Sequence, residues 1–263
     1  MLDVVPAEDG QLQVRDRTSE PTPLDAEIGT ALAEALAAAL PALDLFGRLA
    51  AIRVQLAGRI VFTTSFGLED QAITHAIFSQ SLAIDVATLD TGRLFPETHE
   101  VWAETEARYG RRVAAFAPAQ GSLEALIAQQ GIGGMRSSLT ARLECCNVRK
   151  VAPLDRALAG RAAWITGIRA DQSAGRAALS AVAFDQRHRL VKANPLFDWT
   201  REQTLDFVRT HGVPYNRLHD RGFLSIGCAP CTRAVAPGEP ERAGRWWWEQ
   251  SEKKECGLHS EAI

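Results

Sequence analysis

The sequence lacks a strong excess of charge of either sign. Its 263 residues carry 29 Lys and Arg against 32 Asp and Glu, which gives a formal net charge of −3. A general nucleic-acid-binding protein needs a broadly basic surface, so this balance argues against that class, although local basic clusters can still hold a small anion. The N-terminus also lacks a basic start followed by an apolar stretch, so we expect no secretory signal.

A hydrophobic run long enough to cross a bilayer is also missing. The longest apolar stretch, residues 26–44, contains Glu34 and is interrupted by Pro41. A membrane-spanning helix needs about 20 consecutive apolar residues. Apolar residues recur every four positions in this stretch, which predicts an amphipathic surface helix. We therefore expect no membrane contact and a cytoplasmic location.

Cysteine is scarce, with five residues spread along the chain. An odd and dispersed set is a poor disulfide framework for a secreted protein. It is more typical of a reduced compartment, in which thiols bind metals or take part in catalysis.

Strand and helix patterns alternate through the middle of the chain. Strand patterns occupy residues 59–65, 82–90, 111–117 and 162–168, and helix patterns occupy residues 68–80, 97–110, 122–131 and 199–212. This alternation predicts an α/β fold with a mostly parallel sheet and helices on both faces. We expect one such domain over residues 24–239. Residues 1–23 are polar, contain three prolines, and are expected to form a disordered arm.

Polar segments that contain glycine follow three of the expected strands. They are TTSFGLED (63–70), LDTGRLFPET (89–98) and TGIRADQS (166–173). Ligands of open parallel sheets bind at the carboxyl ends of the strands, and a helix N-terminus favours an anion. Ser65 and Gly67 stand at such an exit, while Arg93 and Arg169 are cations just beyond two others. Each segment alone fits an ordinary capped turn, but the three together favour a nucleotide crevice.

Four of the cysteines form two pairs. Cys145 and Cys146 are adjacent in an expected helix, and Cys228 and Cys231 form a CxxC motif. Four thiolates in two pairs are typical of a metal site. Consecutive helical side chains point roughly 100° apart, which suits the separate irons of an iron–sulfur cluster better than one ion. Zinc held by four cysteines remains open, as do a disulfide or inert buried thiols.

The fifth cysteine, Cys256, lies in a charged segment near the C-terminus. Lys253 and Lys254 precede it, and nearby cations lower the pKa of a thiol and make it a better nucleophile. His259 is either a base or contact for this thiol or a solvated tail residue. Lys150 follows Cys146 by about one helical turn, so its charge is expected near the cysteine pairs, unless it is an ordinary surface lysine.

The motifs LDTGRLFPET, TGIRADQS, SIGCAPCTRA, RWWWE and KKECGLH, together with the adjacent cysteine pair, resemble the assimilatory adenylyl-sulfate (APS) reductases of the sulfonucleotide reductase family. The resemblance covers residues 59–259. It implies a fold similar to that of the ATP pyrophosphatases, of the adenine nucleotide alpha hydrolase-like type. Family members without the four paired cysteines reduce 3′-phospho-APS (PAPS) and hold no cluster. The presence of all four therefore implies a [4Fe-4S] cluster and APS as the substrate.

The resemblance also implies roles for single residues. Cys256 would attack the sulfur of APS, release AMP and form an S-sulfocysteine, from which thioredoxin would release sulfite. The expected substrate-binding residues are Ser65, Gly67, Arg93, Lys150, Arg169, Arg242, Arg245 and His259. Residues 240–263 would form a mobile catalytic tail, and the protein is expected to be a homo-oligomer without a nucleic-acid partner.

Three other functions remain as alternatives. A PAPS reductase would need additional basic residues for the 3′-phosphate. A zinc-stabilised nucleotide-binding module would have the pocket and the metal but no catalysis. An ATP-using thiolation enzyme that acts on tRNA fits less well, because SFGLED (65–70) lacks the denser glycine and serine loop expected for pyrophosphate.

Overall fold

The computed structural model describes residues 2–6, 12–16, 24–177, 179–249 and 255–258. Within them, the fold is built on a six-stranded sheet with the strand order β5-β4-β3-β6-β8-β7. Its strands are β3 (Ile60–Thr64), β4 (Asp85–Leu89), β5 (Ala114–Phe116), β6 (Ala163–Ile165), β7 (Val182–Asp185) and β8 (Leu190–Ala193). Neighbouring strands are parallel except for the antiparallel edge pair β7–β8. The expected α/β fold with a mostly parallel sheet is confirmed.

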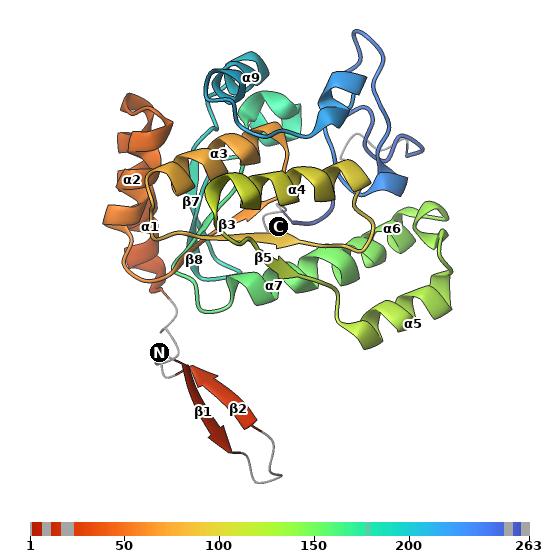
Figure 1. Cartoon of the computed structure of the whole chain (residues 1–263), viewed down its shortest axis with the longest axis horizontal. Coiled ribbons are helices and arrows are strands. Elements are labelled where there is room, and N and C mark those ends of the chain that lie inside the picture. Colours follow the sequence, from red (N-terminus) through yellow and green to blue (C-terminus); the bar gives the residue numbers. More distant parts are fainter. Residues whose placement is uncertain (1, 7–11, 17–23, 178, 250–254, 259–263) are drawn as a thin grey trace.

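Helices cover both faces of this sheet (Figure 1). Successive strand residues point to opposite faces, and the buried side chains divide accordingly. Ile60 and Phe62 belong to the main core, whereas Val61 between them packs on the other face with Leu154 and Leu158 of α7 (Ala152–Leu158). Such continuous burial explains why the central strands read as unbroken apolar runs.

The helices that pack into the main core begin and end at recognisable sequence signals. They include α3 (Leu68–Ser79), α4 (Pro96–Tyr109) and α9 (Arg201–Thr210). Helix α4 starts at a proline and ends at Gly110, which adopts the left-handed conformation that suits glycine. Helix α9 begins with a capping box in which Thr200 and Gln203 exchange hydrogen bonds between side chain and backbone.

The remaining helices are α1 (Ala26–Ala39), α2 (Leu45–Gln55), α5 (Gln120–Gln130), α6 (Leu139–Cys146) and the short α8 (Ala174–Ala177). A π-helical turn, Asn147–Val151, connects α6 to α7. Three 3₁₀ turns, Gly134–Arg136, Ala170–Gln172 and Ala229–Cys231, lie close to the site described below.

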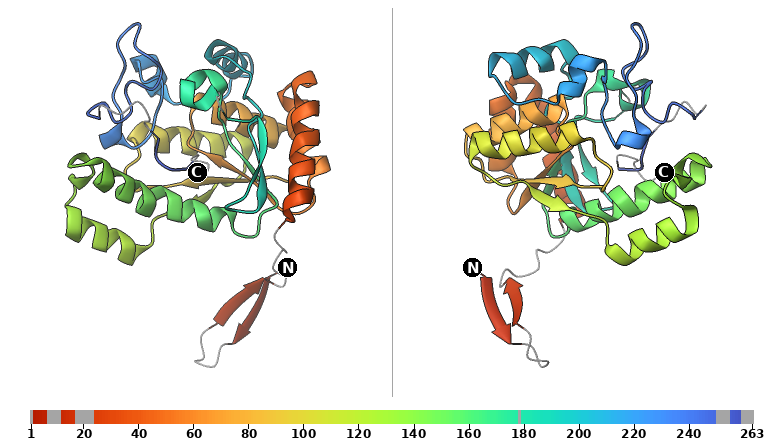
Figure 2. Two further views of the ribbon diagram at one scale, coloured as in Figure 1. Left: turned by 180° about the vertical axis from the view of Figure 1, so that it is seen from behind. Right: turned by 45° about the vertical axis from the view of Figure 1, so that its right-hand side comes forward.

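The structure contains strands that the sequence patterns did not indicate. Strands β7 and β8 lie in a stretch that we assigned to no element. In the N-terminal arm, β1 (Leu2–Pro6) pairs with β2 (Leu12–Asp16) in an antiparallel ladder that stands apart from the six-stranded sheet in every view (Figures 1 and 2). The disorder expected for residues 1–23 and the mobility expected for residues 240–263 stay predictions.

A membrane-spanning helix is also absent among the described residues. None of their helices combines the length and the apolar character that a bilayer crossing requires.

Candidate active site and cysteine cavity

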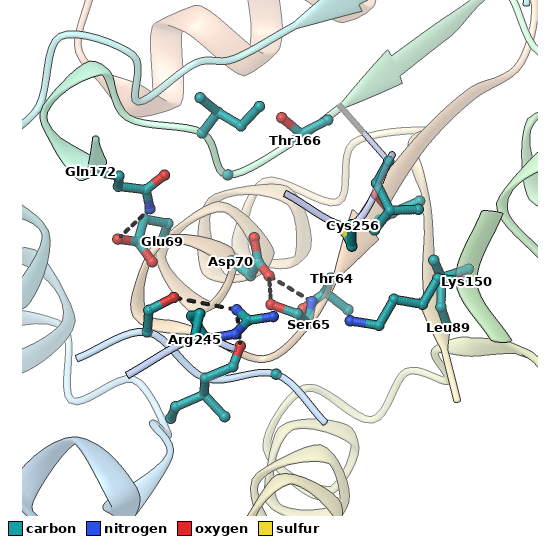
Figure 3. A pocket seen from close by; sticks show the side chains of 18 of the residues that line it. Thr64, Ser65, Glu69, Asp70, Leu89, Lys150, Thr166, Gln172, Arg245 and Cys256 are labelled. Atoms are coloured by element: carbon teal, nitrogen blue, oxygen red, sulfur yellow. Dashed lines mark hydrogen bonds between the residues drawn. The ribbon is translucent and has the colours of Figure 1, made fainter. Parts of the chain in front are cut away.

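A pocket of about 1230 Å³, including its open mouth, lies at the carboxyl ends of the central strands. Strands β3 and β6 are neighbours there, although β3 continues along the chain to β4 on its other side. This point at which the strand order reverses is the usual ligand crevice of open parallel sheets. Its floor includes Ser65 after β3, Thr91 after β4 and Thr166 after β6. The three strand exits therefore converge as expected (Figure 3).

Ser65 is fixed at the floor of the pocket by Asp70 in the first turn of α3. One Asp70 oxygen, Oδ2, accepts hydrogen bonds from the Ser65 backbone N–H at 2.5 Å and from its hydroxyl at 2.7 Å (Figure 3). Burial raises the pKa of Asp70 to about 6, against the lowering effect of these two bonds. The serine hydroxyl is thus oriented before any ligand arrives.

Two glycines shape the same floor. Gly67 precedes α3 and lines the pocket, but a Cβ there would meet only ordinary contacts, the closest at 3.5 Å from the Glu69 carboxylate. At Gly167, a Cβ would lie 2.2 Å from Asp70 Oδ1, so only glycine fits between β6 and α3. Close approach of the backbone is therefore required at Gly167, which the sequence did not single out.

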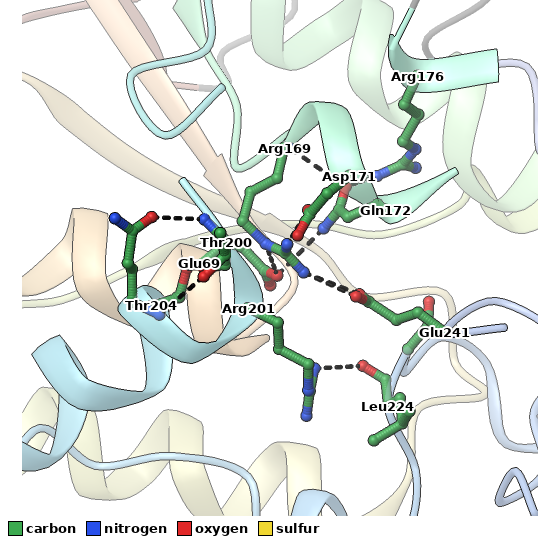
Figure 4. Close-up of polar contacts among 12 residues, drawn as sticks. Glu69, Arg169, Asp171, Gln172, Arg176, Thr200, Arg201, Thr204, Leu224 and Glu241 are labelled. Atoms are coloured by element: carbon green, nitrogen blue, oxygen red, sulfur yellow. Dashed lines mark hydrogen bonds and ion pairs between the residues drawn. The ribbon is translucent and has the colours of Figure 1, made fainter. Parts of the chain in front are cut away.

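Arg169 lies beside the pocket and not in its lining. Its side chain is 0% exposed, and its Nε donates to Glu69 Oε1 at 2.7 Å while a terminal nitrogen pairs with Glu241 at 2.8 Å (Figure 4). Asp171 pairs with the other terminal nitrogen. Burial lowers the pKa of this guanidinium, but the charges of Glu69 and Glu241 raise it by a larger amount, so the net shift is upward. Arg169 therefore connects α3 to Glu241, at the start of the C-terminal tail.

Four cations also line the pocket. They are Lys150, Arg176, Arg242 and Arg245. Three of them were expected to bind substrate, whereas Arg176 on the short helix α8 was missed. Desolvation, followed by the charges of Arg176 and Arg245, lowers the pKa of Arg242 to about 9. The crowding of positive charge in a partly buried pocket makes this region suitable for an anion.

Cys256 lines the same pocket as these cations and the Ser65 floor (Figure 3). The residue is 7% exposed, so the thiol lies inside the pocket and is largely shielded from the surrounding solvent. The neighbouring Glu255 is held by its backbone carbonyl, which accepts from Arg142 of α6 at 2.8 Å. Lys253, Lys254 and His259, to which the sequence suggested roles, lie outside the described residues.

The other four cysteines meet in a second cavity of about 380 Å³. Cys145 and Cys146 come from the end of α6, and Cys228 and Cys231 flank a 3₁₀ turn far along the chain. All five cysteines of the protein are free thiols, which excludes a disulfide between the pairs. Within the described part of the chain, no three His, Cys, Asp or Glu side chains are grouped to hold a metal ion. All four cysteines line this cavity.

Lys150 belongs to the lining of both cavities. It projects from the π-helical turn that follows Cys146, a rare form of helix that often occurs at functional sites. Burial lowers the pKa of Lys150, but the thiols of Cys228, Cys256 and Cys146 raise it by more. Lys150 thus lies beside the cysteines, as its spacing from Cys146 predicted, and it also borders the pocket.

Several hydrogen-bond donors around the cysteine cavity lack partners. Among the described residues, Arg149 Nε, Arg245 Nε and Trp246 Nε1 are buried without a hydrogen bond, and all three residues line the cavity. Thr91 Oγ1 lies 3.3 Å from Cys228 Sγ. Buried donors without partners are costly. An anionic group inside the cavity would offer acceptors beside these residues.

Arg93 was expected at the nucleotide and lies instead at the cysteine cavity. Its guanidinium donates to the Ile132 carbonyl and approaches Met135 Sδ at 3.7 Å. The described structure therefore brings together seven of the expected substrate-binding residues along one continuous region, with Arg93 on the cysteine side and Arg169 beneath the pocket.

Comparisons with known proteins agree with this arrangement. A family profile described as "Phosphoadenosine phosphosulfate reductase domain" matches residues 59–234. An Agrobacterium fabrum protein named adenosine 5'-phosphosulfate reductase is 54% identical over 224 residues, which cover 85% of this chain and 86% of the relative. A protein of the same name from Allochromatium vinosum is 51% identical over 200 residues, or 76% of this chain and 78% of the relative.

A solved structure is also similar over most of its length. The crystal structure of phosphoadenylyl-sulfate (PAPS) reductase from Candida auris, a phosphate complex, has a TM-score of 0.67 and 26% identity. The match covers 82% of this chain and 100% of that one.

Proposed function

The chain belongs to the phosphoadenosine phosphosulfate reductase domain family, and from that premise we propose that it is an adenylyl-sulfate reductase of sulfate assimilation and cysteine biosynthesis. It is an oxidoreductase that converts APS to sulfite and AMP. The observation that carries this proposal is the position of Cys256, whose thiol lines a nucleotide-sized pocket next to Lys150, Arg242 and Arg245. A nucleophile and the cations that stabilise its leaving group thus share one pocket.

The reaction proceeds in two halves. The Cys256 thiolate attacks the sulfur of APS, forms a sulfur–sulfur bond, and breaks the bond between that sulfur and the phosphate oxygen. AMP leaves with the electron pair of the broken bond, and Cys256 carries the sulfonate. A thiolate of a dithiol reductant, such as thioredoxin, then attacks Cys256 Sγ and expels sulfite. The second thiol of the reductant restores Cys256, and the reductant ends as a disulfide that has supplied two electrons.

The pocket residues divide the work of the first half. Ser65, held by Asp70, and the amino end of α3 bind the nucleotide over the strand ends. Lys150, Arg242 and Arg245 hold phosphate and sulfate oxygens and stabilise the negative charge that moves onto the leaving phosphate. Arg176 lies in the same lining and joins this set.

We propose that the cysteine cavity holds a [4Fe-4S] cluster, with Cys145, Cys146, Cys228 and Cys231 as its ligands. Three features support this assignment: the four free thiols around one space, the buried donors without partners, and the cations that line the cavity. The group would supply a fixed negative charge, while the electrons for the reaction come from thiols. Lys150 would transmit the effect of that charge to the pocket, because it borders both cavities.

Intact mass spectrometry after addition of APS without reductant tests this function. We expect the protein to gain the mass of one sulfonate group, located by fragmentation at Cys256, and to release one AMP. Cys256→Ser should gain no sulfonate, and the surface variant Glu104→Gln should behave as the unmodified protein. Sulfonation that persists in Cys256→Ser would contradict the assignment of the nucleophile.

Competition between APS and PAPS at equal concentration tests the substrate. The curated relatives at 51–54% identity are named for APS, and we expect APS to be consumed first. Preferential consumption of PAPS would reverse that choice. A thioredoxin-type partner, a cytoplasmic location and a homo-oligomeric state complete the proposal. Turnover with a purified dithiol protein tests the partner, and the mass of the protein in solution tests the oligomeric state.

A further inference from the structure

Glu255, the residue before the nucleophile, places its carboxylate among the cations of the pocket. Its Oε1 lies 3.1 Å from Arg176 Nε, and its Oε2 lies 3.1 Å from a terminal nitrogen of Arg242. Both arginine side chains are 12% exposed. All three residues line the pocket together with Cys256. A side chain of the tail therefore occupies the part of the pocket that is best suited to an anion.

The other carboxylates of the pocket lining have different partners. Glu69 and Glu241 pair with Arg169 beneath the pocket, and Asp70 accepts from Ser65. Glu255 is thus the carboxylate that the described structure pairs with the cationic end. Burial raises the pKa of Glu255, but the charges of Arg242 and then Arg176 lower it by more, in agreement with this pairing.

The contact of the Glu255 carboxylate with Arg176 and Arg242 can be replaced by a contact with another anion. Buried guanidinium groups without a counter-charge are costly, so the cationic end favours a state in which some anion is present. The tail supplies a carboxylate when no ligand is bound, and a phosphate or sulfate group can replace it with more oxygens and more charge. Two anions cannot occupy the same position between Arg176 and Arg242.

We propose that Glu255 is a resident counter-anion, and that a phosphate- or sulfate-bearing ligand must displace its carboxylate from Arg176 and Arg242 in order to bind. Ligand binding and the docked position of Glu255 therefore oppose each other, and this coupling is reciprocal. Because Glu255 is covalently next to Cys256, this exchange takes place beside the thiol, while the Glu255 backbone carbonyl still accepts from Arg142. The chemical identity of the ligand rests on the proposed function, but the competition itself holds for any small anion.

Binding of AMP and of inorganic sulfate to Glu255→Gln tests this proposal without any catalytic step. Glutamine keeps the size of the side chain and removes its charge. We expect at least one of the two anions to bind about 5- to 10-fold more tightly to the variant, at the low end of typical coupling between ligands. The gain should shrink as salt is added, because salt screens the interaction that has been removed. Isothermal titration calorimetry measures both constants.

Two matched variants separate charge from position. Glu255→Asp keeps the charge and should bind both anions much as the unmodified protein does. Glu104→Gln removes an exposed carboxylate from α4 and should also leave binding unchanged. A merely structural loss at position 255 could weaken anion binding but could not strengthen it, so equal or weaker binding of both anions by Glu255→Gln overturns the proposal. Failure of the unmodified protein to become sulfonated by APS would refute the proposed function and leave this binding result standing.

Discussion

Lys150 stands on the wall between two cavities, and a single amine there affects both. Its neighbours on one side are the thiols of Cys146 and Cys228, and on the other side it borders the pocket that contains Cys256. An ammonium group in such a position can stabilise charge on a leaving group without moving, which is the condition for strong electrostatic catalysis.

Replacement of Lys150 by alanine should slow the sulfonation of Cys256 by about 100-fold, the usual effect of removing one preorganised donor of this kind. The iron content per chain should stay the same, because none of the four proposed cluster ligands has been changed. Single-turnover mass spectrometry measures the first quantity, and metal analysis measures the second.

Lys150→Arg serves as the control for this variant. It retains the charge but places it on a larger group, so partial recovery of the rate is expected. A Lys150→Ala protein that is sulfonated at the unmodified rate would show that Lys150 has no such role.

The sequence predicted some site residues well for a physical reason. Lys150 lies one helical turn from Cys146, and a helix fixes distances at that range. Arg169 also follows a strand exit, but its orientation depends on Glu69 and Glu241, which are distant in sequence. Local patterns give the position of a residue on the backbone, whereas its ion pairs depend on the tertiary fold. Arg176 was missed for the same reason.

At the scale of elements, His188 connects the turn between β7 and β8 to helix α7. Its Nδ1 lies 2.8 Å from Asp185 and its Nε2 lies 3.0 Å from Asp155 on α7. Arg187 also pairs with Asp155 at 3.0 Å. The hydrogen bond to Asp185 raises the pKa of His188, burial lowers it, and the bond to Asp155 raises it again, so that the net shift is upward. The protonated imidazole is therefore the form that links the two elements.

This linkage should stabilise the fold more strongly at pH 6 than at pH 9. A group whose pKa is higher in the folded state contributes fully below its unfolded pKa of about 6.5, and the contribution is lost as the pH rises through the folded value. Replacement of His188 by Asn removes the positive charge. A hydrogen bond to a charged partner contributes about 1.5 kcal/mol. For a chain of this size, we therefore expect Tm of the variant to fall about 3 °C further below the unmodified protein at pH 6 than at pH 9.

Scanning calorimetry at the two pH values measures this difference. His99→Asn is the matched control, since His99 is exposed and its contact with Asp90 is long, at 3.8 Å. Any fall in Tm caused by His99→Asn should be the same at pH 6 and at pH 9. A difference for His188→Asn that is the same at pH 6 and pH 9 would contradict the linkage.

Elements with strong periodicity were predictable, and those that depend on distant partners were not. The apolar run of β3 and the capped helix α9 carry their own signals. Strands β7 and β8 have four residues each and flank a turn rich in charge, so their ladder is recognisable only next to β6. The π-helical turn before α7 depends on a shift in backbone hydrogen bonds, for which we found no marker in the sequence.

At the scale of the whole molecule, the two cavities share one wall. Lys150, Arg245 and Trp246 line both of them. The cysteine cavity joins the end of α6 to the segment around Cys228 and Cys231, and the pocket joins the strand ends to the tail. Whatever fills the cysteine cavity therefore also holds one side of the nucleotide pocket in place.

Removal of the proposed cluster with an iron chelator should consequently have two effects. A group bound to ligands that are far apart in the chain acts as a cross-link, and a cross-link that closes a long loop contributes about 4 kcal/mol. In a domain of this size, that corresponds to a fall in Tm of about 10 °C. Binding of AMP should also weaken, because Lys150 and Arg245 lose the structure that positions them. Calorimetry measures both quantities. Chelation should lower the Tm of the Cys256→Ser variant by the same amount as that of the unmodified protein, since Cys256 is not one of the proposed ligands. A chelated protein that keeps the Tm of the untreated protein would show that the four cysteines hold no stabilising group, and the shared wall would then have to be rigid without one.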